Sequence, residues 1–470
     1  MIVKKKELSV RNGGTKDEKR RVGRRALIKW SVAAGAALGL PQWKVFEVLE
    51  GSSGKALAQE ASCLETNRSV HIIGGTGGFA WFNLLWPHND VAAAMDPSMS
   101  WHAIGEETMA DSHRPLTLGP ESPWADRSGT RQVTCMMAGQ NETHTNRPSS
   151  NNQVAMNVDL FATCASMQAA NPTLVPVIAV DDAPYRDAPG APRVARVGRA
   201  RDIVALFNSA ASRAGGLLST PAHADLFSTR YSTFLSLRAA AGSPTYRRGF
   251  DTGNDAASYL GRNLSDRLAP TDEDFLRYGV TAVSRDVNRE LAALLITTAK
   301  AFSMGLTSSV VIPAFRDDPH GAFNDMGRLR GTVGTLGRSL DAFLEDLGQF
   351  EEPSCSGDTL ADNTVISIHG DTPKTPLNRQ NWPDGTPENS NWIYVLGAGL
   401  LKSGWFGGVD RDGTVRGWNP ETGEDADVSA ATTANAASAA VAYAVARGDL
   451  RKLGDFFRGT LRGVAASETI

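Results

Sequence analysis

Short apolar runs alternate with polar loops after residue 60, and this pattern predicts an α/β fold. Runs typical of strands cover 69–73, 132–137, 174–180, 309–315, 364–368 and 392–396. Between the strands at 309–315 and 364–368, apolar residues recur at steps of three and four over 329–347, which predicts a helix with one apolar face. A strand, a crossover helix and a second strand form a right-handed parallel unit. Both strands are apolar on both faces, as expected where helices cover each side of a sheet.

Further patterns complete the predicted architecture. Apolar spacing predicts a helix over 152–168, mainly helical structure over 200–305, and a helix over 430–447 that stops at Gly448. The pair Asp412-Gly413 between two short apolar runs predicts a hairpin. The predicted fold is therefore α/β, with a central, mostly parallel sheet flanked by helices, a helical insertion at about 198–305 and a small C-terminal β-hairpin.

Length and charge narrow the class of protein. The chain has 470 residues, of which 41% are hydrophobic and 21% charged, as in ordinary globular proteins. Residues 1–30 carry eleven Lys/Arg and three Asp/Glu, a net charge of +8, so a total of −3 leaves −11 on the remainder. We expect no nucleic-acid partner, because such binding needs a basic surface that displaces counterions.

The basic segment has the features of an export signal. The sequence Arg24-Arg25-Ala26-Leu27-Ile28-Lys29 resembles the twin-arginine motif, and a mildly apolar run follows from Trp30 to Leu40. That run is shorter than the ~20 apolar residues of a spanning helix. Ala56-Leu57-Ala58 offers a small-residue cleavage site. We therefore predict a signal peptide over 1–58, an exported domain over 59–470, and a periplasmic or secreted location.

This prediction names one partner, the twin-arginine export machinery, and no stable membrane span after cleavage. Two alternatives stay open: retention of the signal as a membrane anchor, and a cytosolic basic tail ahead of a short helix. The four cysteines are Cys63, Cys135, Cys164 and Cys355. None lies in a C-x-x-C pair, which argues against a cysteine-rich zinc site. Disulfides persist outside the cytoplasm, but buried free thiols fit the sequence equally well.

Carboxylates and imidazoles follow two of the predicted strands. Asp318 and His320 come after the strand at 309–315, and His369 and Asp371 come after the strand at 364–368. In open α/β sheets, ligands bind beyond the carboxyl ends of the strands. If the two strands are neighbours, the four side chains converge. By ligand type they suit one divalent metal ion, whose identity the sequence leaves open.

A third polar cluster follows the strand at 132–137. It contains Thr143 and His144, and a hydroxyl beside an imidazole or a metal can act as a nucleophile. The same loop residues also suit a purely structural role, because Thr and Asn side chains cap the helix that follows. Both interpretations stay open at this point.

The order of these landmarks resembles an exported bacterial family, the domain of unknown function 1501 family, which is related in fold to alkaline phosphatases and sulfatases. The resemblance covers most of the chain after the signal and is clearest from Val310 to Leu401. It is carried by Asp318-Pro319-His320, Asp341-Ala342-Phe343, Asp371-Thr372-Pro373-Lys374-Thr375-Pro376, the apolar 395–399 and Gly74-Gly75.

The resemblance implies a metal-dependent hydrolase of phosphate or sulfate esters. Through the matching motifs it implies metal ligands at Asp318, His320 and Asp371, and catalytic residues at Thr143, His144 and Lys374. His369 joins the ligand set as a substitute ligand, because it follows the strand at 364–368. The chain departs from the family pattern at Gly77, Pro387 and Glu388, where the family has metal ligands, so a two-metal site is damaged here. Two other functions remain: a catalytically degenerate protein with a binding or structural role in the envelope, and a carbohydrate-active enzyme using Asp318 and Asp371 as paired carboxylates.

Overall fold

A central sheet of eight strands organises the part of the chain that the structure describes. The computed structural model describes residues 64–73, 102–104, 116–118, 133–140, 152–171, 173–212, 264–314, 326–355, 357–370, 390–409 and 415–466. Across the sheet, the strands are β12 (Gly404–Phe406), β4 (Thr134–Gln140), β11 (Ser390–Leu396), β10 (Thr364–His369), β1 (Arg68–Ile73), β9 (Thr307–Pro313), β7 (Val175–Val180) and β8 (Ala195–Val197).

The sheet is mostly parallel, as predicted. Within it, β11 alone runs against its neighbours and is antiparallel to both β10 and β4. The other strand pairs in this sheet are parallel. The α/β fold class with a mostly parallel sheet is thereby confirmed.

The two strands flanking the predicted crossover helix are parallel but are not neighbours. β1 lies between them and pairs with β10 on one side and β9 on the other. In the register, Ile73 is level with both His369 and Pro313. Because adjacent strands lie about 4.8 Å apart, the carboxyl ends of β9 and β10 are separated by roughly 10 Å. The condition that the two strands are neighbours is therefore not met, but both ends belong to one edge of the sheet.

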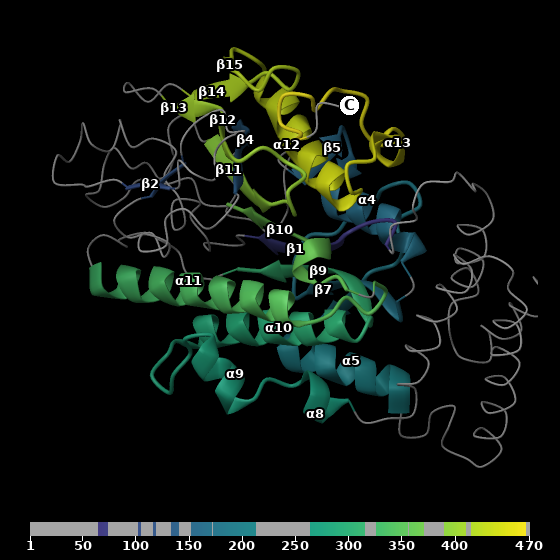
Figure 1. Cartoon of the computed structure of the whole chain (residues 1–470), viewed down its shortest axis with the longest axis vertical. Helices are drawn as coiled ribbons and strands as arrows, with labels where there is room; N and C mark the ends of the chain where they lie inside the picture. The colour runs from purple at the N-terminus through teal and green to yellow at the C-terminus, as the bar shows by residue number, and fades with distance from the viewer. Residues whose placement is uncertain are drawn as a thin grey trace, which may run out of the picture. The chain divides into compact units, whose positions relative to one another are not determined.

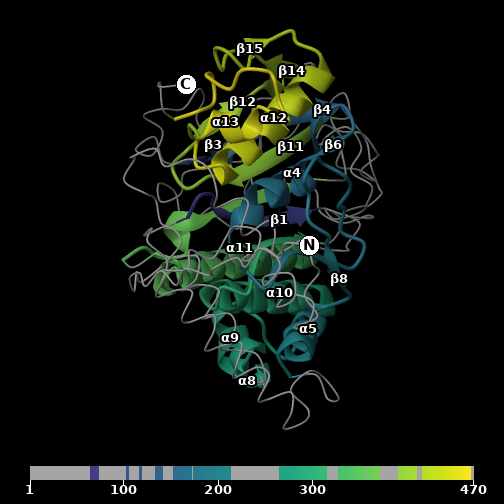
Figure 2. The same cartoon turned by 90° about the vertical axis from the view of Figure 1, so that its right-hand side faces the viewer.

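Helices cover both faces of the sheet (Figures 1 and 2). Side chains alternate between faces along a strand. Ser69, in β1, contacts Gln168, which begins the 3₁₀ turn η4 (Gln168–Ala170) directly after α4 (Leu160–Met167). Arg68, one position earlier, lies 5.5 Å from the ring of Phe302 in α10 (Asp286–Ser303). The α4 and α10 helices therefore lie on opposite faces.

The remaining helices join these two layers. α12 (Ala430–Val445) packs against α4, β4 and β10, while α5 (Ala200–Ser212) and α11 (Met326–Gln349) pack against α10. Shorter helices and turns are α8 (Ser265–Leu268), α9 (Asp272–Arg277), α13 (Leu450–Leu453) and η6 (Ala361–Asn363). The predicted helices at 329–347 and 430–447 correspond to α11 and α12. Gly448 ends α12 with φ of 78°, and its N–H donates to the Tyr443 carbonyl.

The helix predicted over 152–168 was wrong in its first half. That half is a two-stranded hairpin of β5 (Gln153–Ala155) and β6 (Val158–Asp159), whose turn includes Asn157 at φ of 63°. The helix α4 begins only after Asp159, whose carboxylate accepts from the N–H of Ala162 at 2.8 Å. Asn tolerates the left-handed conformation and Asp is a preferred cap, so local turn chemistry overrode the apolar spacing.

The predicted C-terminal hairpin is confirmed and extended. β13 (Gly408–Val409) pairs with β14 (Val415–Trp418), which also pairs with β15 (Asp425–Ala426). The start of the predicted first strand is instead β12, which joins the main sheet beside β4. Two further strands, β2 (His102–Ile104) and β3 (Leu116–Leu118), form a separate two-stranded antiparallel sheet. Among the described residues, no helix combines the length and apolar character needed to cross a membrane.

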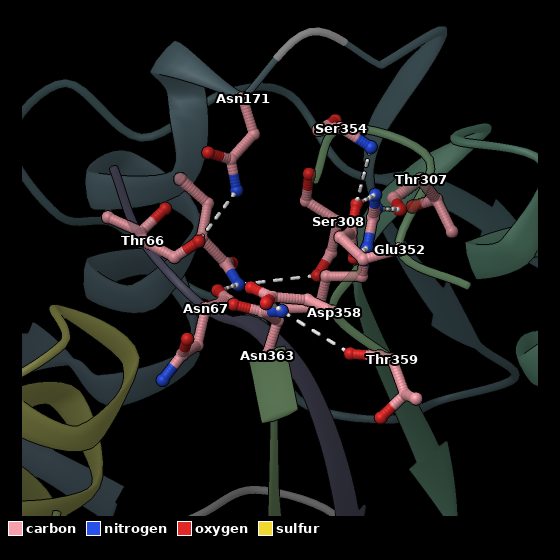
Figure 3. Close-up of polar contacts among 12 residues, drawn as sticks. Thr66, Asn67, Asn171, Thr307, Ser308, Glu352, Ser354, Asp358, Thr359 and Asn363 are labelled. Atoms are coloured by element: carbon pink, nitrogen blue, oxygen red, sulfur yellow. Dashed lines mark hydrogen bonds and ion pairs between the residues drawn. The ribbon is translucent and has the colours of Figure 1, made fainter. Parts of the chain in front are cut away.

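A polar network closes the amino edge of the sheet (Figure 3). The Arg68 guanidinium donates to both carboxylate oxygens of Glu352 at 2.8 and 2.6 Å and to the Thr307 carbonyl at 2.7 Å. Asn171 donates to the Thr66 carbonyl, and Asn363 donates to Asp358 and to the Thr359 carbonyl. These contacts satisfy strand-end and loop groups, so this edge has a structural role.

Candidate functional site: two buried histidines at the carboxyl edge

The predicted ligands and catalytic residues follow strands that end at the carboxyl edge of the sheet. β1, β4, β9 and β10 all end there, and β11 begins there because it runs the opposite way. The predicted ligands and catalytic residues Asp318, His320, Asp371, Thr143, His144 and Lys374 follow these strand ends in sequence and lie outside the described residues. Gly77, Pro387 and Glu388 also lie outside the described residues. His369 is the one predicted site residue that the structure describes.

His369 is the last residue of β10, not the start of a loop as expected. Its side chain is buried. Its Nε2 atom lies 2.7 Å from the hydroxyl oxygen of Ser367. On the other side of that hydroxyl, Nδ1 of His71 in β1 also lies at 2.7 Å. Because His71 and Ser367 are register partners on adjacent strands, the sheet itself sets this alignment.

One aromatic ring, that of Phe161, packs against both imidazoles. The ring of Phe161 in α4 meets the His71 ring edge to face at a centroid distance of 5.0 Å, and the His369 ring at 5.4 Å. The two imidazole centroids are 6.3 Å apart. His71, Ser367 and Phe161 are all fully buried. The histidine–serine–histidine cluster, defined as His71, Ser367 and His369, is therefore buried beside the Phe161 ring.

Burial keeps both imidazoles neutral. It lowers the pKa of His71 from its usual 6.5 to about 3. Burial, with a smaller contribution from His71, holds the pKa of His369 well below its usual value. Desolvation disfavours the charged form, so each ring carries one N–H group and one lone pair at neutral pH.

One nitrogen of each imidazole contacts Ser367, and the other makes no hydrogen bond to a described residue. Within the part of the chain that the structure describes, Nδ1 of His369 and Nε2 of His71 are buried and have no hydrogen-bond partner. Buried polar atoms are normally satisfied, and an orphan is therefore informative. A neutral imidazole with a bare nitrogen is the form in which histidine binds a metal. No group of three or more His, Cys, Asp or Glu that could hold a metal occurs among the described residues.

Two members of the cluster, His71 and Ser367, were missed in the sequence. The strand at 364–368 was interpreted as apolar on both faces, and the residues of both strands, 69–73 and 364–368, are buried. Their odd positions, however, carry Ser69, His71, Ser367 and His369. A period of two among the polar residues was the available signal, because alternate residues share one face of a strand.

The cysteines show no disulfide in the described core. Cys135, Cys164 and Cys355 form no bridge, and Cys63 lies outside the described residues. Burial raises the pKa of the Cys135 and Cys164 thiols, so neither is poised as a nucleophile or a metal ligand.

Comparisons with models of protein families, with curated proteins and with solved structures found no match.

Proposed function

We propose that the chain is an exported, metal-dependent hydrolase of phosphate or sulfate esters, with its site at the carboxyl edge of the sheet. The observation that carries this proposal is Nδ1 of His369, a buried nitrogen at the last position of β10 that has no hydrogen-bond partner among the described residues. The proposed ligands beside it are Asp318, His320 and Asp371, and the motif resemblance supports the same set.

The register supports convergence of these ligands. Asp371 follows His369 by two residues, and Asp318 follows the end of β9 by five. Since the two strand ends are roughly 10 Å apart on either side of β1, short loops suffice to bring both carboxylates to one ion. A bound divalent ion would polarise the ester and activate a water or Thr143. His144 and Lys374 are the further proposed catalytic residues.

A second candidate is a catalytically degenerate protein that binds a ligand or has a structural role in the envelope. Gly77 and Pro387 favour it, because neither offers a ligating side chain where the resembling family has one, and Glu388 replaces a histidine. Both candidates share the proposed export by the twin-arginine machinery, which recovery of the chain in the periplasmic fraction would test.

Elemental analysis of the protein from that fraction separates the two candidates. We expect at least about one zinc or manganese per chain, in line with the ligand set, and loss of that metal in Asp318→Ala. The matched control is Asp182→Ala, which removes an exposed carboxylate after β7 at the same edge of the sheet. Metal-loaded wild type should hydrolyse 4-nitrophenyl phosphate or sulfate. Metal without turnover would favour the binding protein, and metal kept by Asp318→Ala would contradict the proposed site.

A further inference from the structure

The hydrogen bonds of the histidine–serine–histidine cluster constrain one another. Ser367 has one hydroxyl proton and two lone pairs, and each neutral imidazole has one N–H and one lone pair. If both imidazoles donated to Ser367, its proton would be left unbonded in a buried site. If neither donated, one proton would have to serve two acceptors. Both hydrogen bonds form and the hydroxyl proton is also used only when one imidazole donates to Ser367 and Ser367 donates to the other.

Two such arrangements exist. In the first, His369 donates from Nε2 to Ser367, Ser367 donates to Nδ1 of His71, and His71 keeps its proton on Nε2. Nδ1 of His369 is then a bare lone pair. In the second, every proton is reversed, and Nδ1 of His369 carries a proton that no described group accepts. The arrangement thus decides whether His369 can bind a cation.

We propose that Ser367 is a positioning residue that couples the tautomers of His71 and His369, so that His369 presents Nδ1 as a lone pair to a divalent cation. The cation part rests on the proposed function, whereas the coupling does not. The ring nitrogen that a metal takes is set by the hydrogen bond of the other nitrogen. Here that bond leads to a second imidazole in place of the usual carboxylate or carbonyl. The rigid frame of β1 and β10 and the Phe161 ring hold the three groups in line.

The test compares wild type with Ser367→Ala, which removes the link, and Ser367→Thr, which restores a hydroxyl. The matched control is Ser309→Ala. Ser309 is equally buried in β9 of the same sheet, but its hydroxyl lies 3.0 Å from Ser69 and does not contact either histidine. Circular dichroism and the unfolding transition establish that each variant folds.

The first readout is the ¹⁵N spectrum of the full exported protein labelled at histidine, with Zn²⁺ as the probe. Signals are assigned by their loss in His71→Gln and His369→Gln. Without zinc, Ser367→Ala should move the ring-nitrogen shifts of both histidines, whereas Ser309→Ala should move neither. In wild type, zinc should fix His369 with its proton on Nε2 and drive His71 to the same tautomer. In Ser367→Ala, His71 should no longer respond to zinc.

The second readout is zinc affinity by calorimetry. We expect Ser367→Ala to weaken binding by about 10–100-fold, the usual effect of removing an outer partner of a ligating histidine. Ser367→Thr should recover most of it, and Ser309→Ala should match wild type. Wild type that binds no zinc would overturn the proposed metal site, while the zinc-free spectra still decide the coupling. Zinc binding that Ser367→Ala leaves unchanged, or His71 shifts that ignore Ser367→Ala, would overturn the role of Ser367.

Discussion

At the scale of single residues, Arg68 and Glu352 form an ion pair that is almost completely buried in the described core. The side chains are 2% and 0% exposed, and the guanidinium grips both carboxylate oxygens. Removing water from two charges is expensive, and only close, multiple hydrogen bonds offset that cost. The pair joins the start of β1 to the segment after α11, so it fixes where the crossover helix returns to the sheet.

We expect Glu352→Met to destabilise the fold by about 3–5 kcal/mol, because the Arg68 charge would remain buried without a counter-ion. Arg68→Met should cost a similar amount. The double variant Arg68→Met with Glu352→Met should cost clearly less than the sum, because no charge is then stranded. Urea unfolding of the four proteins measures this coupling. Arg451, whose exposed side chain pairs with Asp449, supplies the control, and Arg451→Met should barely change stability. Additive effects of Arg68→Met and Glu352→Met would contradict the argument.

At the scale of elements, the sequence predicted the segments whose apolar pattern is continuous. β9 and β10 were predicted from uninterrupted apolar runs, and α11 from apolar residues at steps of three and four. The hairpin before α4 was missed, since two short strands and a turn at Asn157 carry too little periodicity to outweigh helical spacing. The position of β1 between β9 and β10 was missed for another reason. Pairing partners far apart in sequence are set by tertiary packing, which local patterns do not contain.

The candidate site was predictable only in part, and for the same reason. His369 was found from its place after a strand, but its connection through Ser367 to His71 depends on the register of β1 with β10. Nearly 300 residues separate these strands along the chain. A polar residue at every second strand position could have raised the question of a shared face. It could not have identified which strand lies alongside.

The helix α4 carries a prediction of its own, because its cap is a buried acid. Burial raises the pKa of Asp159 from 3.8 to about 6, although hydrogen bonds from the N–H groups of the first turn oppose the shift. The folded protein therefore holds a proton between about pH 4 and 6 that the unfolded chain has released. The contribution of this group to stability is present below pH 4 and is lost as the pH rises to 6.

Asp159→Asn keeps a capping oxygen and removes the titration. Relative to wild type, we expect this variant to gain roughly 3 kcal/mol of unfolding free energy between pH 4 and pH 7, since each pKa unit is worth about 1.4 kcal/mol. Urea unfolding across this range measures the difference. Asp449, which caps α13, is the matched control, because hydrogen bonding to Arg451 lowers its pKa. Asp449→Asn should therefore lose stability relative to wild type as the pH rises toward about 4, and should run nearly parallel to wild type between pH 4 and pH 7. Parallel wild-type and Asp159→Asn curves would contradict burial as the cause.

At the scale of the whole molecule, the sheet and its two helical layers must supply the stability without disulfides among the described cysteines. Cys135 lies in β4, Cys164 in α4, and Cys355 after α11. All three are buried, and none is cross-linked to another. Exported proteins commonly use disulfides to restrict the unfolded chain. The three described cysteines form no such cross-link, so the described core depends on the packing of the folded state.

We therefore expect the unfolding free energy of the purified protein to be the same with and without dithiothreitol. A cross-link would add about 2–4 kcal/mol under oxidising conditions, chiefly through the unfolded chain. Alkylation should be slow in the folded protein, because burial excludes the reagent and raises the pKa of the Cys135 and Cys164 thiols. Unfolding should expose all three as thiols. Cys63→Ser serves as the control for the one cysteine outside the described residues. A stability loss on reduction that persists in this control would show that a cross-link holds the core together.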